Sequence, residues 1–262
     1  MSGLYSVVFK WAPATYHDNE ILSRNVLCFS SRYDADEFYR QLQTLKYNNA
    51  QFMTRLSRSS PQFWTYDSNH NGDAVYFLFK WQLMSNFKNV VTLLNNSSYQ
   101  AYMYSLPNLV TGPDWLSGDT FFIRNRRQPN LYWWVHDTHI HTSEQRRTKF
   151  RIQKTPGHDD TTIAGSCKPV LIRKDHVHVG VVTETVTSSA VTGGAQFVSI
   201  RDTKNKSNSL TLDNKPYLWI FGELLQQKVG VRWGDEIPEE KGQMKPLLVF
   251  MPNDGGDEWE LC

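Results

Sequence analysis

From residue 120 to the C-terminal end, short apolar segments alternate with turn residues, and this pattern constrains the fold more than any other feature. Val, Ile, Phe, Tyr and Trp dominate the segments, and these residues favour strands. The predicted strands are 120–124, 130–137, 149–154, 168–174, 176–187, 195–202, 209–213 and 246–251. So many short strands predict a mostly antiparallel β-sandwich. The segment 216–234 fits either strand–turn–strand or a short helix, and periodicity does not separate the two.

The N-terminal third combines strands with helices. We predict strands over 4–11 and 21–29, followed by a helix that Ser31 caps, three residues before Asp34. The apolar stripe of this helix consists of Ala35, Phe38, Leu42 and Leu45. The polar segment 50–73 is predicted to be a long loop or an irregular arm.

Two further elements are predicted before residue 97. The continuous apolar run 74–83 is typical of a buried central strand. Ser85 is the predicted cap of a second short helix, whose inward residues are Phe87, Val90, Val91 and Leu94.

The chain shows no internal repeat and no clear linker, so we predict a single domain over 1–262. Within it, 1–119 is an α+β portion and 120–262 is β-rich. The expected fold class is mainly β, an antiparallel β-sandwich with two or more accessory helices in the N-terminal third.

Six of the eight histidines fall between residues 131 and 182. Four of them form two His-x-His pairs on predicted strands, and each pair should project from one sheet face. The pairs are His139 with His141 and His176 with His178. Four imidazoles from two adjacent strands could bind Zn²⁺ or a similar ion, and the first pair with Glu144 is similar to a cupin site. The cupin spacing is longer, however, so a pH-sensing or solvated sheet face is the stronger interpretation.

No catalytic signature stands out in the sequence. Ser166 and Cys167 lie in no G-x-S-x-G or cysteine-protease signature, and His158-Asp159-Asp160 lacks a well-placed distal histidine for an iron site. There is no P-loop and no G-x-G-x-x-G. We therefore expect no enzymatic activity, no cofactor and no metal ion.

Charge is distributed unevenly along the chain. Eight cations and two acids lie between Phe121 and Lys154, whereas eight acids and two cations lie between Asp235 and Cys262. The predicted assembly contacts are Arg124, Arg126, Arg127, Arg146, Arg147, Arg151, Asp254, Asp257, Glu258 and Glu260. We expect the acidic end of one copy to dock on the basic segment of another, in a contact that propagates; two solvated segments are the alternative. The net charge is only +2, so nucleic acid is a disfavoured partner.

Aromatic residues exceed the needs of one core, with nine Trp, twelve Tyr and fourteen Phe. The exposed-aromatic candidates are Trp64, Tyr66, Trp133 and Trp134. Trp133 and Trp134 are adjacent on a predicted strand, so one of them faces each way. Exposed aromatic side chains bind sugars or protein partners.

Three cysteines form no disulfide framework, and no apolar stretch resembles a signal peptide or a membrane span. These features predict an intracellular, reducing compartment, the cytoplasm or nucleus of a host cell, with no secretion by a signal peptide and no membrane partner.

The order of elements resembles that of the viral polyhedrins, the occlusion-body matrix proteins of insect viruses. The likeness includes the helix EFYRQLQTLKY, the unit AVYFLFKW…FKNVVTLLNN and the stretch NKPYLWIFGELLQQKVGVRWG. It covers most of the chain but includes no invariant motif. This chain also enters a strand by Leu4, whereas some polyhedrins carry a projecting N-terminal arm. The resemblance implies a dense lattice around virions, stable near neutral pH and dissolved by strong alkali.

The leading functional hypothesis is a non-enzymatic structural protein that assembles with itself into a lattice or occlusion body, with virions as a further expected partner. The first alternative is a lectin-like carbohydrate-binding protein with a glycan partner and Trp64, Trp133 or Trp134 as platforms. The second alternative is a cupin-like enzyme with a histidine metal site.

Overall fold

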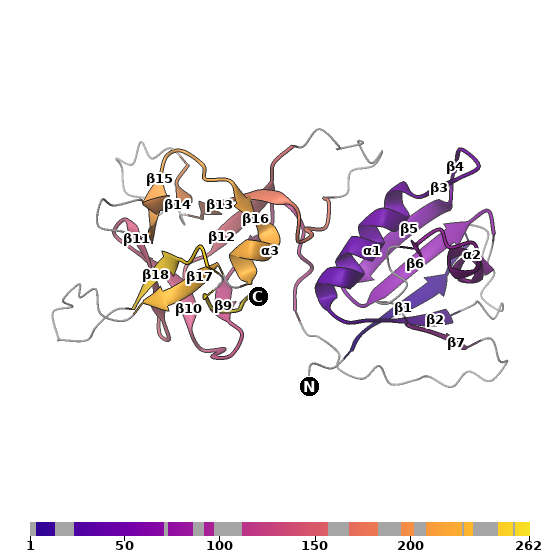
Figure 1. Ribbon diagram of the computed structural model, residues 1–262, viewed down its shortest axis with the longest axis horizontal. Coiled ribbons are helices and arrows are strands. Elements are labelled where there is room, and N and C mark those ends of the chain that lie inside the picture. The colour runs from indigo at the N-terminus through magenta and orange to yellow at the C-terminus, as the bar shows by residue number, and fades with distance from the viewer. Residues whose placement is uncertain are drawn as a thin grey trace. The chain divides into compact units, whose positions relative to one another are not determined.

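The structure is a computed structural model, and the chain folds into two compact units (Figure 1). Unit 1 comprises Met1–Asp114 and Thr161–Val170, and unit 2 comprises Trp115–Asp160 and Leu171–Cys262. The division at Asp114 lies close to the predicted division of the single domain at 119/120. The described residues are 4–13, 24–70, 73–85, 92–96, 112–156, 168–182, 195–201, 208–226, 228–232, 246–253 and 255–262.

Unit 1 contains a five-stranded mixed sheet with the strand order β5-β6-β1-β2-β7. Its strands are β1 (Tyr5–Trp11), β2 (Arg24–Phe29), β5 (Met53–Ser60), β6 (Phe63–Ser68) and β7 (Thr92–Asn96). Strand β1 is antiparallel to β2 and parallel to β6. A separate hairpin joins β3 (Lys46–Tyr47) to β4 (Ala50–Gln51) through Asn48 and Asn49, which both have positive φ. Asparagine tolerates this backbone region, and hairpin turns of type I′ require it.

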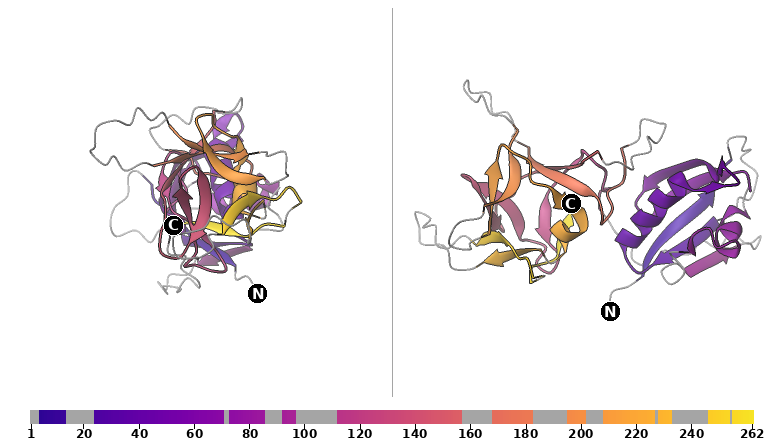
Figure 2. Two further views of the ribbon diagram at one scale, coloured as in Figure 1. Left: turned by 90° about the vertical axis from the view of Figure 1, so that its left-hand side faces the viewer. Right: turned by 45° about the horizontal axis from the view of Figure 1, so that its top comes forward.

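Helix α1 (Arg32–Thr44) lies across one face of this sheet (Figure 2). Ser31 caps it, because its side chain accepts a hydrogen bond from the Asp34 amide. Ala35, Phe38 and Leu42 are fully buried on the side that packs against the strands. The predicted helix, its cap and its apolar stripe are therefore confirmed up to Leu42; Leu45 is the residue at which the helix ends.

Three predictions for the stretch after this helix are wrong. The segment 50–73 contains β4, β5 and β6 rather than a long loop. The run 74–83 begins with helix α2 (Ala74–Lys80), because Ala74, Val75 and Leu78 are buried while Tyr76 and Lys80 are exposed. That spacing is helical, and an unbroken apolar run does not distinguish a buried helix from a buried strand. The predicted second helix contained Leu94, which lies in β7 and pairs with Val26; residues 86–91 fall outside the described part.

Unit 2 is built on a large sheet whose pairings between strands are antiparallel. Its described strands are β8 (Thr120–Phe121), β9 (Ile123–Asn125), β10 (Tyr132–His136), β11 (His139–Ser143), β12 (Phe150–Lys154), β13 (His176–Val181), β14 (Phe197–Arg201), β15 (Ser209–Asp213), β16 (Trp219–Ile220), β17 (Val229–Arg232), β18 (Leu247–Phe250) and β19 (Trp259–Leu261).

This sheet nearly closes on itself. Its strand order runs β19-β9-β10-β11-β18-β15-β14-β13-β12-β8, so the consecutive strands β8 and β9 lie near its two ends. Phe122, the residue between them, exchanges two backbone hydrogen bonds with Cys262. The mainly β architecture with few helices agrees with the predicted fold class.

Most of the predicted strands of unit 2 are present, with one exception. The segment 168–174 contains a turn, in which the Asp175 amide donates to the Ile172 carbonyl and the Ile172 amide donates to the Asp175 carboxylate. The segment 216–234 combines both of its alternatives, because β16 runs directly into the short helix α3 (Phe221–Leu225), and β17 follows.

Candidate functional site

The outer side of β10 carries a row of aromatic and histidine side chains. Tyr132, Trp134 and His136 are partly exposed, whereas Trp133 between them is completely buried against Phe150 and Trp259. This alternation follows from the two-residue period of a strand. The expectation that Trp133 and Trp134 face opposite ways is confirmed.

Three cationic side chains lie over the aromatic rings of this row and of Phe122. The Arg146 guanidinium is 4.9 Å from the ring centre of Trp134, and that of Arg147 is 4.5 Å from Phe122 and 5.6 Å from Tyr132. The Lys149 ammonium lies 5.4 Å from the Phe122 ring. Each such contact stabilises its geometry by about 0.5–1 kcal/mol at an exposed position. We call Phe122, Tyr132, Trp134, Arg146, Arg147 and Lys149 the cationic–aromatic face.

The loop after β11 holds these cations in place. The Ser143 hydroxyl accepts hydrogen bonds from the amides of Gln145 and Arg146. Thr148 then binds β10 twice, because its amide donates to the Trp133 carbonyl and its hydroxyl accepts from the Val135 amide. The loop is therefore fixed along the strand whose rings it covers.

The acidic C-terminal strand pairs within its own chain. Glu260 and Glu258 form ion pairs with Arg124 at 2.6 Å and Arg126 at 3.5 Å, and Asp257 accepts a hydrogen bond from the Val231 amide. The expected complementarity between basic and acidic segments is thus present, but for these residues the partner is the same copy. Asp254 lies outside the described residues.

The two histidine pairs do not form one ligand set. His139 and His141 are on β11, whereas His176 and His178 are on β13, and β18, β15 and β14 stand between these strands in the sheet order. The prediction that the pairs occupy adjacent strands is wrong. No group of three or more potential ligands (His, Cys, Asp or Glu) is placed to hold a metal ion within the part of the chain that the structure describes.

The four predicted pH-sensing histidines differ in their surroundings. His141 is completely buried, with the rings of Trp134, His136 and His139 about it at 6.0 to 6.3 Å. Burial, and then the positive charge of Arg201, lower the pKa of His139, although Asp137 acts in the opposite direction. His176 is exposed, and His178 is partly exposed. His139 is therefore protonated only at a pH below the ordinary range of histidine.

Three of the four exposed-aromatic candidates are buried, so that prediction is wrong for them. Trp64 and Tyr66 are on the face of β6 that α1 covers, where Trp64 contacts Tyr39 at 5.0 Å and Tyr66 stacks on Phe9 at 4.2 Å. Trp133 belongs to the core of unit 2. Only Trp134 is partly exposed.

A groove of about 520 Å³ lies over β12, β13 and β14. Gly180 pairs with Arg151 on one side and with Phe197 on the other, so these three positions share a sheet face. Because Gly180 has no side chain, the sheet is hollowed between them. The sequence signal was a glycine in the middle of a strand, and it was missed.

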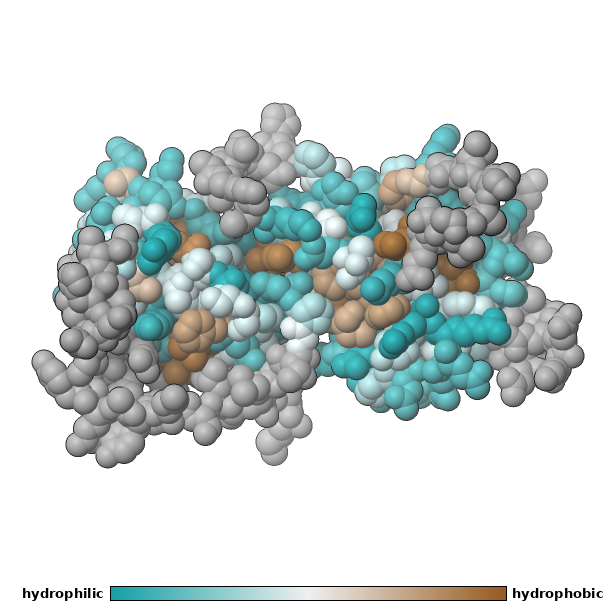
Figure 3. Space-filling view, turned by 180° about the vertical axis from the view of Figure 1, so that it is seen from behind, coloured by the Kyte–Doolittle hydropathy of each residue, from teal (hydrophilic) through white to brown (hydrophobic). Residues whose placement is uncertain are grey.

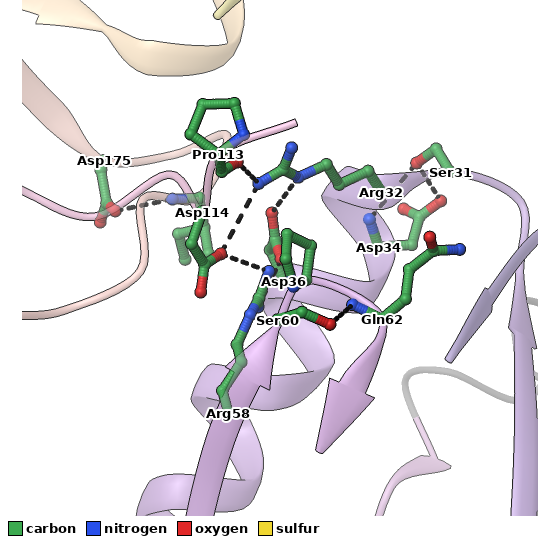
Figure 4. Close-up of polar contacts among 12 residues, drawn as sticks. Ser31, Arg32, Asp34, Asp36, Arg58, Ser60, Gln62, Pro113, Asp114 and Asp175 are labelled. Atoms are coloured by element: carbon green, nitrogen blue, oxygen red, sulfur yellow. Dashed lines mark hydrogen bonds and ion pairs between the residues drawn. The ribbon is translucent and has the colours of Figure 1, made fainter. Parts of the chain in front are cut away.

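Unit 1 contains a buried ion network that sequence analysis also missed (Figure 4). Arg58 pairs with Asp36 at 2.6 Å and with Asp114 at 2.7 Å. Arg32 approaches the same carboxylates at 3.5 and 3.6 Å and donates to the Pro113 carbonyl. Only the pair Arg32–Asp36, four residues apart on a helix, has a sequence signal, because the other partners are distant in the chain.

Ser166, Cys167 and His158-Asp159-Asp160 lie outside the described residues. Among the coloured residues of the face in Figure 3, hydrophobic side chains are interspersed with hydrophilic ones. Comparisons with protein-family models, curated proteins and solved structures found no match to this chain. No helix among the described residues is both long enough and apolar enough to cross a membrane.

Proposed function

We propose that this chain is a non-enzymatic structural protein that assembles with copies of itself, and that the cationic–aromatic face is one side of the contact. The observation that supports this proposal most is the surroundings of the three cations on this face. Arg146, Arg147 and Lys149 are exposed and lie over aromatic rings, and no carboxylate of the described residues pairs with them. Arginine beside Trp and Tyr is the composition that dominates binding energy in protein interfaces.

An acidic segment of a neighbouring copy is the proposed occupant of this face. The acids at 257, 258 and 260 are engaged within their own chain. The other acids of the C-terminal region include Asp235, Glu236, Glu239 and Glu240, which lie outside the described residues. A contact between two different surfaces propagates from copy to copy, as the lattice implied by the polyhedrin resemblance requires.

The two rival functions retain fewer of the residues on which they depend. A lectin-like site needs exposed platforms, but Trp64 and Trp133 are buried and the rings of Trp134 and His136 stack on each other. A cupin-like site needs its histidines together, but the two pairs are on separated strands. Self-assembly is therefore the function that these residues support best.

Sedimentation velocity over a range of protein concentrations tests the proposal. We expect species larger than the monomer at neutral pH, which dissociate when salt shortens the Debye length from about 10 Å to about 3 Å. A strict monomer at high protein concentration and low salt would overturn self-assembly.

Charge reversal tests the two surfaces separately. The double variant Arg146→Glu/Arg147→Glu should stay monomeric, and so should Glu239→Lys/Glu240→Lys. Mixing these two variants should restore large species, because each reversed surface then meets an opposite charge. Lys174→Glu, which reverses an exposed cation outside the cationic–aromatic face and outside the predicted assembly contacts, is the matched control and should assemble normally. Failure of the mixture to assemble would exclude this pair of surfaces.

A further inference from the structure

The groove over β12, β13 and β14 has features of a ligand site and shares no residue with the cationic–aromatic face. We propose that it binds a nucleotide, either free or as part of a single strand of nucleic acid. Its volume of about 520 Å³ lies within the range of small-molecule sites, about 300–1,000 Å³.

The charged residues that line the groove have one sign. Arg151 and Lys154 are the charged side chains among its described lining residues, and none of these lining residues is acidic. Gln153 and Gln196 add amide groups, which donate and accept hydrogen bonds. Guanidinium and ammonium groups are the usual partners of phosphate.

His178 is held in one orientation at the edge of this groove. Its Nδ1 lies 3.1 Å from the Tyr217 carbonyl oxygen, which can only accept, so Nδ1 carries the hydrogen. The other ring nitrogen, Nε2, is then the atom with which His178 can meet a ligand. A backbone partner of this kind fixes both the tautomer and the ring orientation.

The groove also offers an aromatic wall. The Phe197 ring lies beside the Gly180 position, with its nearest carbon atom 3.8 Å from where a Cβ would be, and it meets the His178 ring edge to face at 6.2 Å. Bases stack on such rings in sites that read no sequence, while nearby cations bind the backbone phosphates. A nucleotide combines the two chemistries that the groove provides, a planar ring and an anion.

The charge of the whole chain, +2, argued against nucleic acid, but it averages over acidic and basic regions. A groove responds to the charges that line it, because charges farther away than about 10 Å are screened by salt. The affinity of the groove for an anion therefore depends on the cations that line it rather than on the net charge of the chain.

Fluorescence anisotropy with two probes tests the site, one a fluorescent methylanthraniloyl-ATP and the other a fluorescein-labelled oligothymidylate of about 12 nucleotides. Gly180→Leu should fill the groove. A Cβ at this position meets no atom closer than 3.7 Å, so the strand can accept the side chain. We expect Gly180→Leu and Arg151→Gln each to weaken binding about tenfold or more. Arg127→Gln, which removes an exposed cation outside the groove, should have no effect.

Each result of the binding experiment either supports the proposed site or contradicts it. Binding of either probe that these groove variants weaken supports the site, and the probe that binds identifies the source of the nucleotide. Absence of binding by both probes overturns the proposal. Equal weakening by Arg127→Gln, or full affinity in a folded Gly180→Leu, would show that any binding is non-specific. The variant Arg146→Glu/Arg147→Glu, which tests assembly, should keep probe affinity, so the two proposals can fail separately.

Discussion

Arg58 and Asp36 form an ion pair that is almost completely removed from water, with side-chain exposures of 3 % and 0 %. Burial alone would lower the pKa of Arg58, but the negative charges of Asp36 and Asp114 raise it. The guanidinium also lies 5.4 Å from the Tyr39 ring and 5.5 Å from the Trp64 ring. Loss of the guanidinium would leave the Asp36 carboxylate buried without its closest counter-charge. The carboxylate would still bear the free-energy cost of its removal from water, with less attraction to offset that cost.

The first prediction therefore concerns Arg58. Arg58→Met should destabilise unit 1 by about 3–5 kcal/mol, because it leaves Asp36 buried without its closest counter-charge. Chemical denaturation followed by tryptophan fluorescence measures the change, since Trp64 lies beside the substituted position. Lys46→Met, at an exposed position of the same unit, is the control and should cost little. Equal effects of the two substitutions would show that the ion network contributes nothing to stability.

At the scale of the element, apolar burial and charge contribute differently to the stability of β19. Trp259 is buried, contacts Trp133 at 5.6 Å and donates its indole N–H to the Val229 carbonyl. The neighbouring pair Glu260–Arg124 is about one-third exposed on both sides, so solvent screens it. The strand is therefore held by its core residue and its backbone pairing with β9 more than by its acids.

Two substitutions in this strand test whether apolar burial stabilises it more than charge does. Trp259→Ala should destabilise unit 2 by about 3–5 kcal/mol, as expected for the loss of a buried aromatic side chain. Glu260→Gln should cost no more than about 1 kcal/mol, because the ion pair is partly exposed. Thermal and denaturant unfolding of both variants gives the comparison. A larger loss for Glu260→Gln would mean that charge, rather than burial, anchors the strand.

The elements of this chain differ in how well sequence predicts them. Helix α1 is predictable because its cap and its stripe are local signals. Helix α2 is not predictable from such signals, because the neighbouring segments that cover Val75 and Leu78 decide whether this apolar run forms a helix or a strand. The same limit applies to Trp64 and Trp133, whose burial is decided by distant segments, and to the groove, which requires the register of β13 with both neighbours. The basic residues of the candidate site were predictable, but their aromatic partners Phe122 and Tyr132 were not.

At the scale of the whole molecule, we expect alkali to act on the proposed assembly and on folding at different pH values. Near pH 10, lysines lose their charge and exposed tyrosines become negative, so the small net charge of +2 becomes strongly negative. A contact between a cationic surface and acidic segments weakens when both partners become more negative. Tyr5 behaves differently, because burial raises its pKa to about 12 despite the opposing charges of Arg32 and Arg58.

The sign of the folding effect follows from that shift. Below about pH 10, Tyr5 is neutral in both the folded and the unfolded chain, so it contributes no pH dependence. Above about pH 10 the unfolded chain ionises at this residue first, and the free energy of unfolding falls until the folded pKa of about 12 is reached. Burial also raises the pKa of Tyr66, which adds to the loss in the same direction.

Raising the pH should therefore dissociate the assembly before unit 1 unfolds. Sedimentation velocity should show loss of large species near pH 10, while circular dichroism should show unfolding only at higher pH. Tyr5→Phe separates the two events, because it removes a group that titrates with unfolding and that belongs to the buried core of unit 1. This variant should dissociate at the same pH as the native protein but lose less stability between about pH 10 and 12. If dissociation and unfolding instead coincide, and both shift in Tyr5→Phe, alkali acts through the core of unit 1 rather than through charge at the contact.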